Sequence, residues 1–169
     1  MTFERLDPND FRPVVEPKGG GESIDMGLAG NADVITFKVT AEQSAGTLTF
    51  LEYDARPRSP GVKPHSHDGH EEVFYVLEGT LRMRLGDEVI DAGPGTCVFV
   101  PREVVHAFWN ATDEPVKFVG TWTPAGFETL FRERQELVAE CGALTDEENA
   151  QLAKKHGVNF VSLLPGHDH

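Results

Sequence analysis

The chain has 169 residues, of which 39% are hydrophobic, enough for the core of one domain of ordinary size. Its 15 Lys and Arg stand against 28 Asp and Glu, and the net charge of -13 argues against a surface for nucleic acid or an anionic membrane. No apolar run approaches the roughly 20 residues that span a bilayer, and the acidic start is unlike a signal peptide, so we expect a cytoplasmic protein.

The first segment, residues 1–30, is rich in Pro, Gly and acidic residues and alternates poorly. This composition predicts an arm with little regular structure that lies along a neighbouring strand or subunit. Residues 31–124 instead alternate short β-branched and aromatic runs with Gly, Pro and Asp, which is typical of an all-β sandwich or barrel. We expect eight strands in this part, at residues 33–39, 45–54, 71–77, 80–85, 88–91, 96–100, 105–110 and 116–123.

Residues 125–169 form a predicted helical extension. Apolar residues recur at intervals of three and four from Phe127 to Cys141, which predicts a helix that covers an open face of the barrel. A second helix is expected to begin after Thr145 and to end at Gly157, because Thr145 and Glu148 form a capping-box pattern. The remaining histidines of this extension, His156, His167 and His169, are interpreted as a helix-terminal cation and two exposed residues.

The chemically informative segment runs from His65 to Glu72, and His106 follows 34 residues after Glu72. Side chains two residues apart on a strand point to the same face, so His65 and His67 can present two imidazoles to one point. Glu72 on the next strand and His106 from across the barrel can reach that point as well. Three imidazoles and one carboxylate suit one divalent transition metal ion, Fe, Mn, Ni, Co, Cu or Zn, and leave coordination positions open.

A single pair of histidines two residues apart would most simply be two polar side chains on a surface loop. Two further ligand residues at suitable offsets favour a metal site instead. Glu71 lies beside Glu72, and the spacing from His67 selects Glu72 as the inward residue. A closed structural zinc site would use cysteines, and Cys97 and Cys141 are not near, so we expect both to be packing residues.

These residues resemble the two motifs of the cupin family, found here in His65, His67, Glu72 and Gly79 and in Gly95, Pro101, His106 and Asn110. Two positions depart from the pattern. Gly61 lies only four residues before His65, so the leading glycine is displaced, and Glu103 stands where a glycine is usual. The resemblance implies an all-β cupin jelly-roll β-barrel, to which the helical pattern adds a short C-terminal helical extension.

Three shorter stretches, residues 71–79, 99–101 and 123–127, are similar to small single-domain cupins grouped with quercetin dioxygenases. This resemblance implies a homodimer with one metal ion per barrel, held by His65, His67, Glu72 and His106. In flavonol dioxygenases of this type the ion binds the 3-hydroxyl oxygen of the substrate, and the ligand glutamate takes its proton before dioxygen attacks. Glu72 is therefore also the expected catalytic base.

We accordingly expect a metal-dependent dioxygenase of quercetinase-like type that acts on a small enol-bearing compound, aromatic compounds included. A non-oxidative metal enzyme, such as an isomerase, cyclase or lyase, remains an alternative, as does a non-catalytic small-molecule-binding barrel, because fold and ligands would be shared. Candidate residues for the substrate pocket are His70, Phe74, Val76, Phe99 and Phe108. The apolar members of this set are equally suited to an ordinary barrel core, and His70 to a polar loop.

Overall fold

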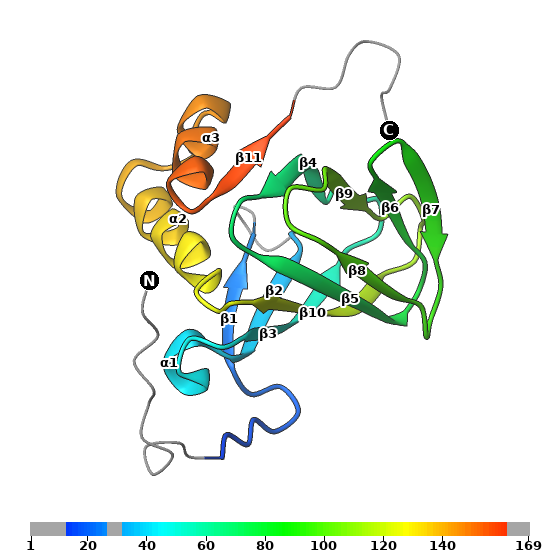
Figure 1. Cartoon of the computed structure of the whole chain (residues 1–169), viewed down its shortest axis with the longest axis horizontal. Coiled ribbons are helices and arrows are strands. Elements are labelled where there is room, and N and C mark those ends of the chain that lie inside the picture. Colours follow the sequence, from blue (N-terminus) through cyan, green and yellow to red (C-terminus); the bar gives the residue numbers. More distant parts are fainter. Residues whose placement is uncertain (1–12, 27–31, 162–169) are drawn as a thin grey trace.

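Two antiparallel β-sheets make up most of the structure, a computed structural model that describes residues 13–26 and 32–161 (Figure 1). The first sheet has the order β1 (Glu22–Asp25), β2 (Val34–Val39), β3 (Thr49–Ala55), β10 (Val116–Thr123), β5 (Glu71–Glu78) and β8 (Cys97–Val100). The second has the order β11 (Val158–Phe160), β4 (Val62–His67), β9 (His106–Trp109), β6 (Leu81–Leu85) and β7 (Glu88–Ala92). The predicted all-β jelly-roll fold is confirmed.

The eight predicted strands correspond to β2, β3 and β5 to β10, with ends shifted by a few residues. Within the described ranges, the prediction omitted β1, β11 and a short helix, α1 (Ala41–Ser44), while β4 is the strand assumed for the two histidines. β1 pairs with β2, so part of the predicted arm does lie along a neighbouring strand, although with more regular structure than expected. Residues 1–12, 27–31 and 162–169 lie outside the described ranges, and with them the interpretation of His167 and His169 as exposed residues. The domain limits at 30 and 124 stay a prediction.

One glycine explains a departure from the family pattern. Gly61 has a φ of 59°, and a Cβ added to it would lie 1.8 Å from the carbonyl oxygen of Phe108. Any side chain there would prevent the start of β4 from approaching β9, the strand of His106. The displaced glycine therefore has a structural role at the entrance to the histidine strand. Glu103, where a glycine is usual, adopts the same left-handed conformation with a φ of 65°.

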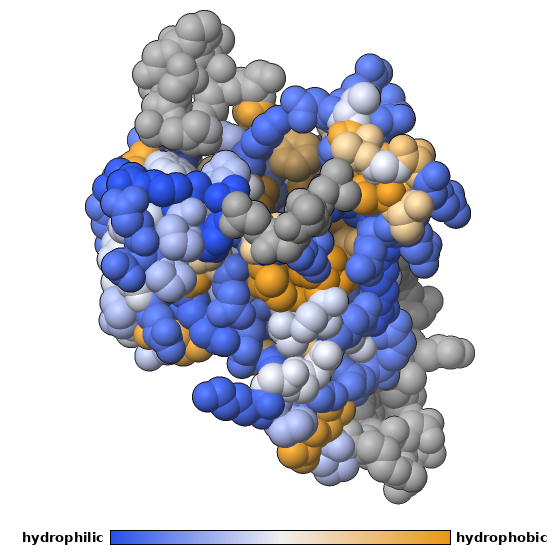
Figure 2. All heavy atoms as spheres, turned by 180° about the vertical axis from the view of Figure 1, so that it is seen from behind, coloured by the Kyte–Doolittle hydropathy of each residue, from blue (hydrophilic) through white to orange (hydrophobic). Residues whose placement is uncertain are grey.

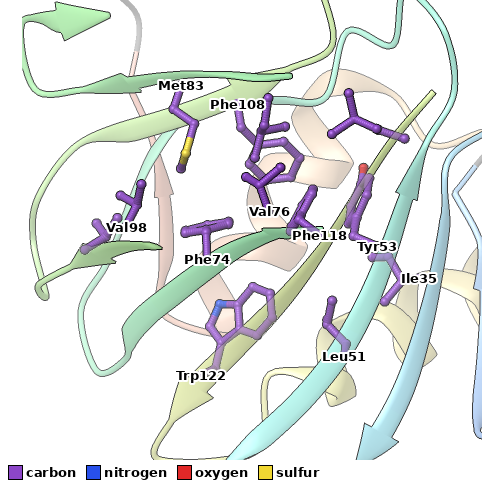
Figure 3. Close-up of a cluster of buried hydrophobic side chains, with 14 of the residues drawn as sticks. Ile35, Leu51, Tyr53, Phe74, Val76, Met83, Val98, Phe108, Phe118 and Trp122 are labelled. Atoms are coloured by element: carbon purple, nitrogen blue, oxygen red, sulfur yellow. The ribbon is translucent and has the colours of Figure 1, made fainter. Parts of the chain in front are cut away.

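The core lies between the two sheets and is rich in aromatic side chains (Figure 3). Tyr53 stacks on Phe118 at a ring distance of 4.8 Å, and Phe108 from the other sheet meets Tyr53 edge-on at 5.2 Å. The inward residues of β5, Phe74 and Val76, are fully buried in this cluster. Cys97 and Cys141 are both exposed free thiols, so the expectation that they pack in the core was wrong.

The C-terminal extension contains α2 (Glu128–Cys141) and α3 (Asp146–Lys155), as predicted. The capping box at the start of α3 is present, with Thr145 N donating to Glu148 Oε2 at 2.8 Å. The apolar side of α2 packs on the core through Leu130 and Phe131. Figure 1 shows α2 and α3 side by side next to the end of the barrel where β1 and β4 lie. No helix in the described ranges is both long and apolar enough to cross a membrane.

A buried carboxylate fastens this extension to the barrel. Glu128, the first residue of α2, is fully buried and accepts hydrogen bonds of 2.5 Å from Ala41 N and from Thr49 Oγ1. At its other end the extension adds β11 to the second sheet, where Val158 pairs with His67 and Phe160 pairs with His65. Both attachments bring α2 and α3 to the end of the barrel that holds the predicted ligands.

Candidate metal centre

The structure brings together the four predicted ligand residues, which come from three strands of two sheets. His65 and His67 point inward from β4, and His65 lies directly opposite His106 of β9 in the strand register. Glu72 reaches the same point from β5, since Glu72, Phe74 and Val76 are the inward residues of that strand. One ligand atom from each of His65, His67, Glu72 and His106 can be chosen so that all lie within 4.8 Å of one another.

Backbone carbonyl groups orient two of the imidazoles. His65 Nδ1 lies 2.9 Å from Lys63 O, and His106 Nδ1 lies 2.9 Å from Val104 O. A carbonyl oxygen can only accept a hydrogen bond, so in each neutral ring Nδ1 carries the proton and Nε2 keeps its lone pair. This is the arrangement by which proteins prepare a histidine to bind a metal through Nε2.

Several nitrogen atoms of this cluster are buried without a hydrogen bond. They are both ring nitrogens of His67 and Nε2 of His106. His67 Nε2 lies against Glu72 Oε1, and His106 Nε2 lies 3.3 Å from Glu72 Oε2, yet neither pair has the geometry of a hydrogen bond. Buried polar atoms rarely stay unpaired, and lone pairs that converge on one point fit a cation. These four buried residues could therefore bind a metal ion.

Electrostatics support the same conclusion. Burial, together with the neighbouring His106, lowers the pKa of His65 to about 3, so this ring is neutral at pH 7. Burial also opposes the charge of Glu72, but the contacts with the His106 and His67 rings outweigh it and hold the pKa of the carboxyl well below its usual range. In turn Glu72 outweighs burial at His106 and raises the pKa of that ring. The Glu72 carboxylate is thus charged, and it favours a positive charge beside it, either a protonated His106 or a metal ion.

Two aromatic residues outside the predicted site support Glu72. Trp122 Nε1 donates a hydrogen bond of 2.5 Å to Glu72 Oε1, and the two residues are register partners on β10 and β5. Gly120 leaves room for the indole, because a Cβ there would lie 2.7 Å from Trp122. Phe127 stacks on Trp122 at 4.8 Å and meets His67 edge-on at 5.1 Å. The alternation of β10 indicates that Trp122 points inward, but only the strand pairing places it at Glu72.

A cavity of about 150 Å³, which we call the chamber, opens beside the cluster and is lined by His65 and Glu72. The rest of its wall is largely apolar and comes from the barrel and from the extension, including Phe108, Trp122, Phe127, Leu130, Phe131 and Leu152. Ligand pockets in proteins commonly combine such apolar walls with a few polar groups. The chamber is therefore the natural place for a small molecule to meet the cluster.

The residues predicted for the substrate pocket lie in different places in the structure. Phe108 lines the chamber, whereas Phe74 and Val76 are buried in the barrel core below it. Phe99 does not line the chamber, because the alternation of β8 turns it outward and leaves it 58% exposed. His70 is half-buried with its ring 6.2 Å from that of His67 and 5.9 Å from that of Phe127, but it does not line the chamber. Burial lowers the pKa of His70, and His67 adds to this effect.

A β-barrel with three inward histidines and one glutamate is the architecture of a metal-binding cupin, and comparison with known proteins agrees. Residues 52–122 match the Cupin domain family. The chain is 28% identical to a quercetin 2,3-dioxygenase of Bacillus subtilis over 74% of its own length and 35% of the relative's. It is 34% identical to a quercetin 2,3-dioxygenase of Aspergillus japonicus, over 56% of its own length and 29% of the relative's.

Among solved structures, an RmlC-like cupin from Shewanella frigidimarina superposes with a TM-score of 0.53 at 21% identity, covering 64% of this chain and 88% of the other. At 21% sequence identity this structural similarity concerns the fold alone. The chain spans about a third of the length of the two dioxygenases. The family match identifies residues 52–122 as a cupin domain, and the sequence relatives and the fold agree with this assignment.

Proposed function

We propose that this protein is a metal-dependent dioxygenase of quercetinase-like type that acts on a small enol-bearing compound. Support comes from the four converging buried residues, the apolar chamber and the similarity to two quercetin 2,3-dioxygenases. The observation that carries the proposal is that His65 and Glu72 belong both to the ligand cluster and to the chamber wall. A molecule in the chamber would thus lie directly against the metal position.

In this proposal His65, His67, Glu72 and His106 hold one divalent transition metal ion. When bound, the ion would act as a Lewis acid toward the enol oxygen of the substrate. Glu72 has a second role as the base that accepts the enol proton. Because Trp122 Nε1 donates to Oε1 of Glu72, Oε2 is the oxygen that is free to take this proton. The contacts with His106 and His67 hold the pKa of Glu72 below its usual range, so the side chain is a charged carboxylate that can both bind a cation and accept a proton.

The aromatic walls contribute by excluding water. Trp122 and Phe127 are buried, and their stacked rings lie between the cluster and the start of α2. Removing water strengthens the interaction between Glu72 and a proton donor, since the local dielectric constant falls. Reaction in such a chamber also protects reactive intermediates from hydrolysis.

The direct test is to load chelator-treated protein with each candidate metal and to follow oxygen uptake with quercetin and with smaller acidic enols. We expect about one metal ion per chain and metal-dependent oxygen consumption with at least one enol. His106→Ala should lose the metal, whereas His156→Ala, which removes a histidine at the C-terminal end of α3 and outside the cluster, should keep it. Product formed without oxygen consumption would favour an isomerase, cyclase or lyase, and binding without any product would favour a binding barrel.

The role of Glu72 as base has its own test. Glu72→Gln keeps an oxygen ligand of the same shape but cannot accept the proton, so turnover should fall much more than metal content. Metal content is measured by elemental analysis and turnover by oxygen uptake on the same preparation. If this variant turns over its substrate at the wild-type rate, Glu72 is not the base.

We further propose that the protein is a homodimer and that the outer face of β5 and β8 forms the contact. Tyr75, Leu77 and Phe99 expose 43%, 40% and 58% of their surface on this face, at the edge of the first sheet. Exposed apolar side chains on the outer face of a sheet, beside its edge strand, are typical of a surface that a second copy covers. Light scattering on the wild type and on Phe99→Glu tests this, with a dimer expected for the first and a monomer for the second.

A further inference from the structure

A second, wider cavity of about 570 Å³ adjoins the chamber, and we call it the vestibule. The two cavities share a neck formed by Met26, Tyr53, Val62, Arg134, Asn149 and Phe160. His65 and Glu72 line the chamber and are absent from the vestibule wall. A molecule in the chamber thus has the metal position at one end and the neck at the other. Figure 2, which shows the molecule from behind, reveals hydrophobic atoms at the floor of a hollow.

Arg134 is the charged residue of the neck. It comes from α2, and its Nε donates a hydrogen bond of 3.3 Å to Asn149 Oδ1 of α3. Within the ranges that the structure describes, no carboxylate forms an ion pair with Arg134. The two terminal nitrogens of its guanidinium group are therefore available to a ligand, and they match the two oxygens of a carboxylate.

The carboxylates that line the vestibule are already engaged. Asp146 pairs with Lys63 at 3.1 Å. Asp33 is buried and accepts hydrogen bonds from Tyr53 Oη at 2.9 Å and from Ser59 Oγ at 2.5 Å. The positive charge of Arg134 is thus not neutralised by these neighbours, in a chain whose net charge is -13. A half-buried cation that faces a cavity favours an anionic ligand.

The second arginine of α2 is already paired with carboxylates. Arg132 lies two residues earlier in α2, and its guanidinium pairs with Glu22 at 2.6 Å and with Glu42 at 3.1 Å. It lines neither the chamber nor the vestibule. Arg132 therefore serves as a matched control for the charge, length and helix position of Arg134.

The size of the chamber limits what can reach from the neck to the metal position. Its volume of about 150 Å³ is that of a cavity that holds a benzene-sized molecule. A flavonol carries several rings and would have to extend through the neck into the vestibule. A compound with one aromatic ring fits the chamber and places its substituents at the two polar ends.

We propose that Arg134 is a specificity-determining residue that binds the carboxylate of a small aromatic acid with a single ring. The ring fills the chamber, and Asn149 holds the guanidinium group in place. At the end of the ligand opposite the carboxylate, an enolic or phenolic hydroxyl would face His65 and Glu72. This part of the inference rests on the proposed function. Recognition of the carboxylate by Arg134 itself requires no metal.

The experiment uses the full chain after treatment with a chelator and measures binding by calorimetry or by the fluorescence of Trp122, which lines the chamber. The probes are benzoate and benzamide, which have the same shape but differ in charge. We expect wild-type protein to bind benzoate at least tenfold more tightly than benzamide. Arg134→Gln should weaken benzoate binding by about tenfold to a hundredfold and leave benzamide binding nearly unchanged. Arg132→Gln should leave both affinities at the wild-type value.

Equal affinities of the wild type for benzoate and benzamide would overturn the inference, as would an unaltered benzoate affinity in Arg134→Gln or no binding of benzoate at all. The wild-type comparison needs no variant, so a folding defect in Arg134→Gln does not remove the test. Arg134→Lys provides a second variant, in which the charge stays and the paired donors are lost. Its benzoate affinity should lie between those of wild type and Arg134→Gln.

Failure of this inference and failure of the proposed function give different results. Selective binding of benzoate through Arg134, with no oxygen uptake on any hydroxylated aromatic acid after metal loading, would reject the dioxygenase and keep the carboxylate site. Oxygen uptake with neutral enols, combined with no preference for benzoate, would keep the dioxygenase and reject the carboxylate site.

Discussion

The barrel and the C-terminal extension contribute to the site in different ways. The four candidate ligand residues belong to strands β4, β5 and β9, which pair with other strands within the two sheets of the barrel. The extension meets the barrel through side chains, chiefly the Glu128 hydrogen bonds and the ring of Phe127, and through the short strand β11. We therefore expect metal affinity to depend on the barrel, whereas the shape and charge of the chamber depend on the extension as well.

Replacing a ligand should have the largest effect. We expect His67→Ala to lower metal affinity by more than about a hundredfold, because even residues that only support a ligand change affinity by up to that factor. Competition with a chromogenic chelator measures the affinity. Phe160→Ala, in the extension strand opposite His65, should leave it within a few-fold of wild type. Similar losses in both variants would contradict the division between barrel and extension.

Removing the buried carboxylate of the extension comes next. Glu128→Ala leaves the amide of Ala41 and the hydroxyl of Thr49 without their acceptor, and each lost hydrogen bond to a charged group costs roughly 1.5–3 kcal/mol. We expect the free energy of unfolding in urea to fall by about 3 kcal/mol while the metal stoichiometry stays at the wild-type value. Glu136→Ala, at an exposed position of the same helix, is the control and should change stability little.

Changes at the contact between Trp122 of the barrel and Phe127 of the extension should have an intermediate effect on metal affinity and stability. Trp122→Phe removes the hydrogen bond to Glu72 but keeps an aromatic ring against Phe127. We expect metal affinity to fall about tenfold, the low end of what outer partners of a ligand contribute. Phe127→Leu keeps the indole hydrogen bond and should lower stability by roughly 1 kcal/mol through the lost ring stacking. A larger metal loss in Phe127→Leu than in Trp122→Phe would assign the effect to packing instead.

The smallest effect concerns Glu103, which lies in the loop between β8 and β9. Its backbone is left-handed with a φ of 65°, a conformation that costs a non-glycine residue roughly 1–2 kcal/mol. Glu103→Gly should raise the free energy of unfolding by about 1 kcal/mol, because the more flexible unfolded chain offsets part of the gain. Glu103→Ala retains the left-handed strain and should not be stabilised. Since Glu103 N also donates to His67 O at 2.9 Å, unchanged metal affinity would show that the loop strain does not extend to the cluster.

Much of the barrel could be predicted from the sequence, because the strands and the ligand spacing are determined by residues close together in the chain. The alternation of β5 and the spacing of His65, His67 and Glu72 are sufficient to predict which side chains converge. The partner of Glu72 was missed, since Trp122 meets it only through the pairing of β10 with β5, 50 residues away in sequence. Phe99 was misplaced for a related reason: an aromatic residue on an edge strand has no sequence feature that tells the inner face from the outer.

The extension was predicted as two helices but not as a part of the site. The periodicity of α2 indicates which side is apolar, yet it does not specify what that side covers. Arg134 could not be assigned to the neck, because its surroundings are set by Asn149 of α3 and by Tyr53 of the barrel. Likewise, β11 has three residues and no alternation long enough to identify it as a strand.

The pairing of β11 with β4 has a consequence for the order in which the protein matures. Translation produces β4, β5 and β9 well before β11, so the strands that carry the histidines leave the ribosome while one edge of β4 is still unpaired. During that interval the backbone of β4 lacks the partner strand that lies opposite His65 and His67 in the finished fold. Formation of the strands that carry the four residues and closure of the wall by β11 are thus separate steps in the biosynthesis of the protein.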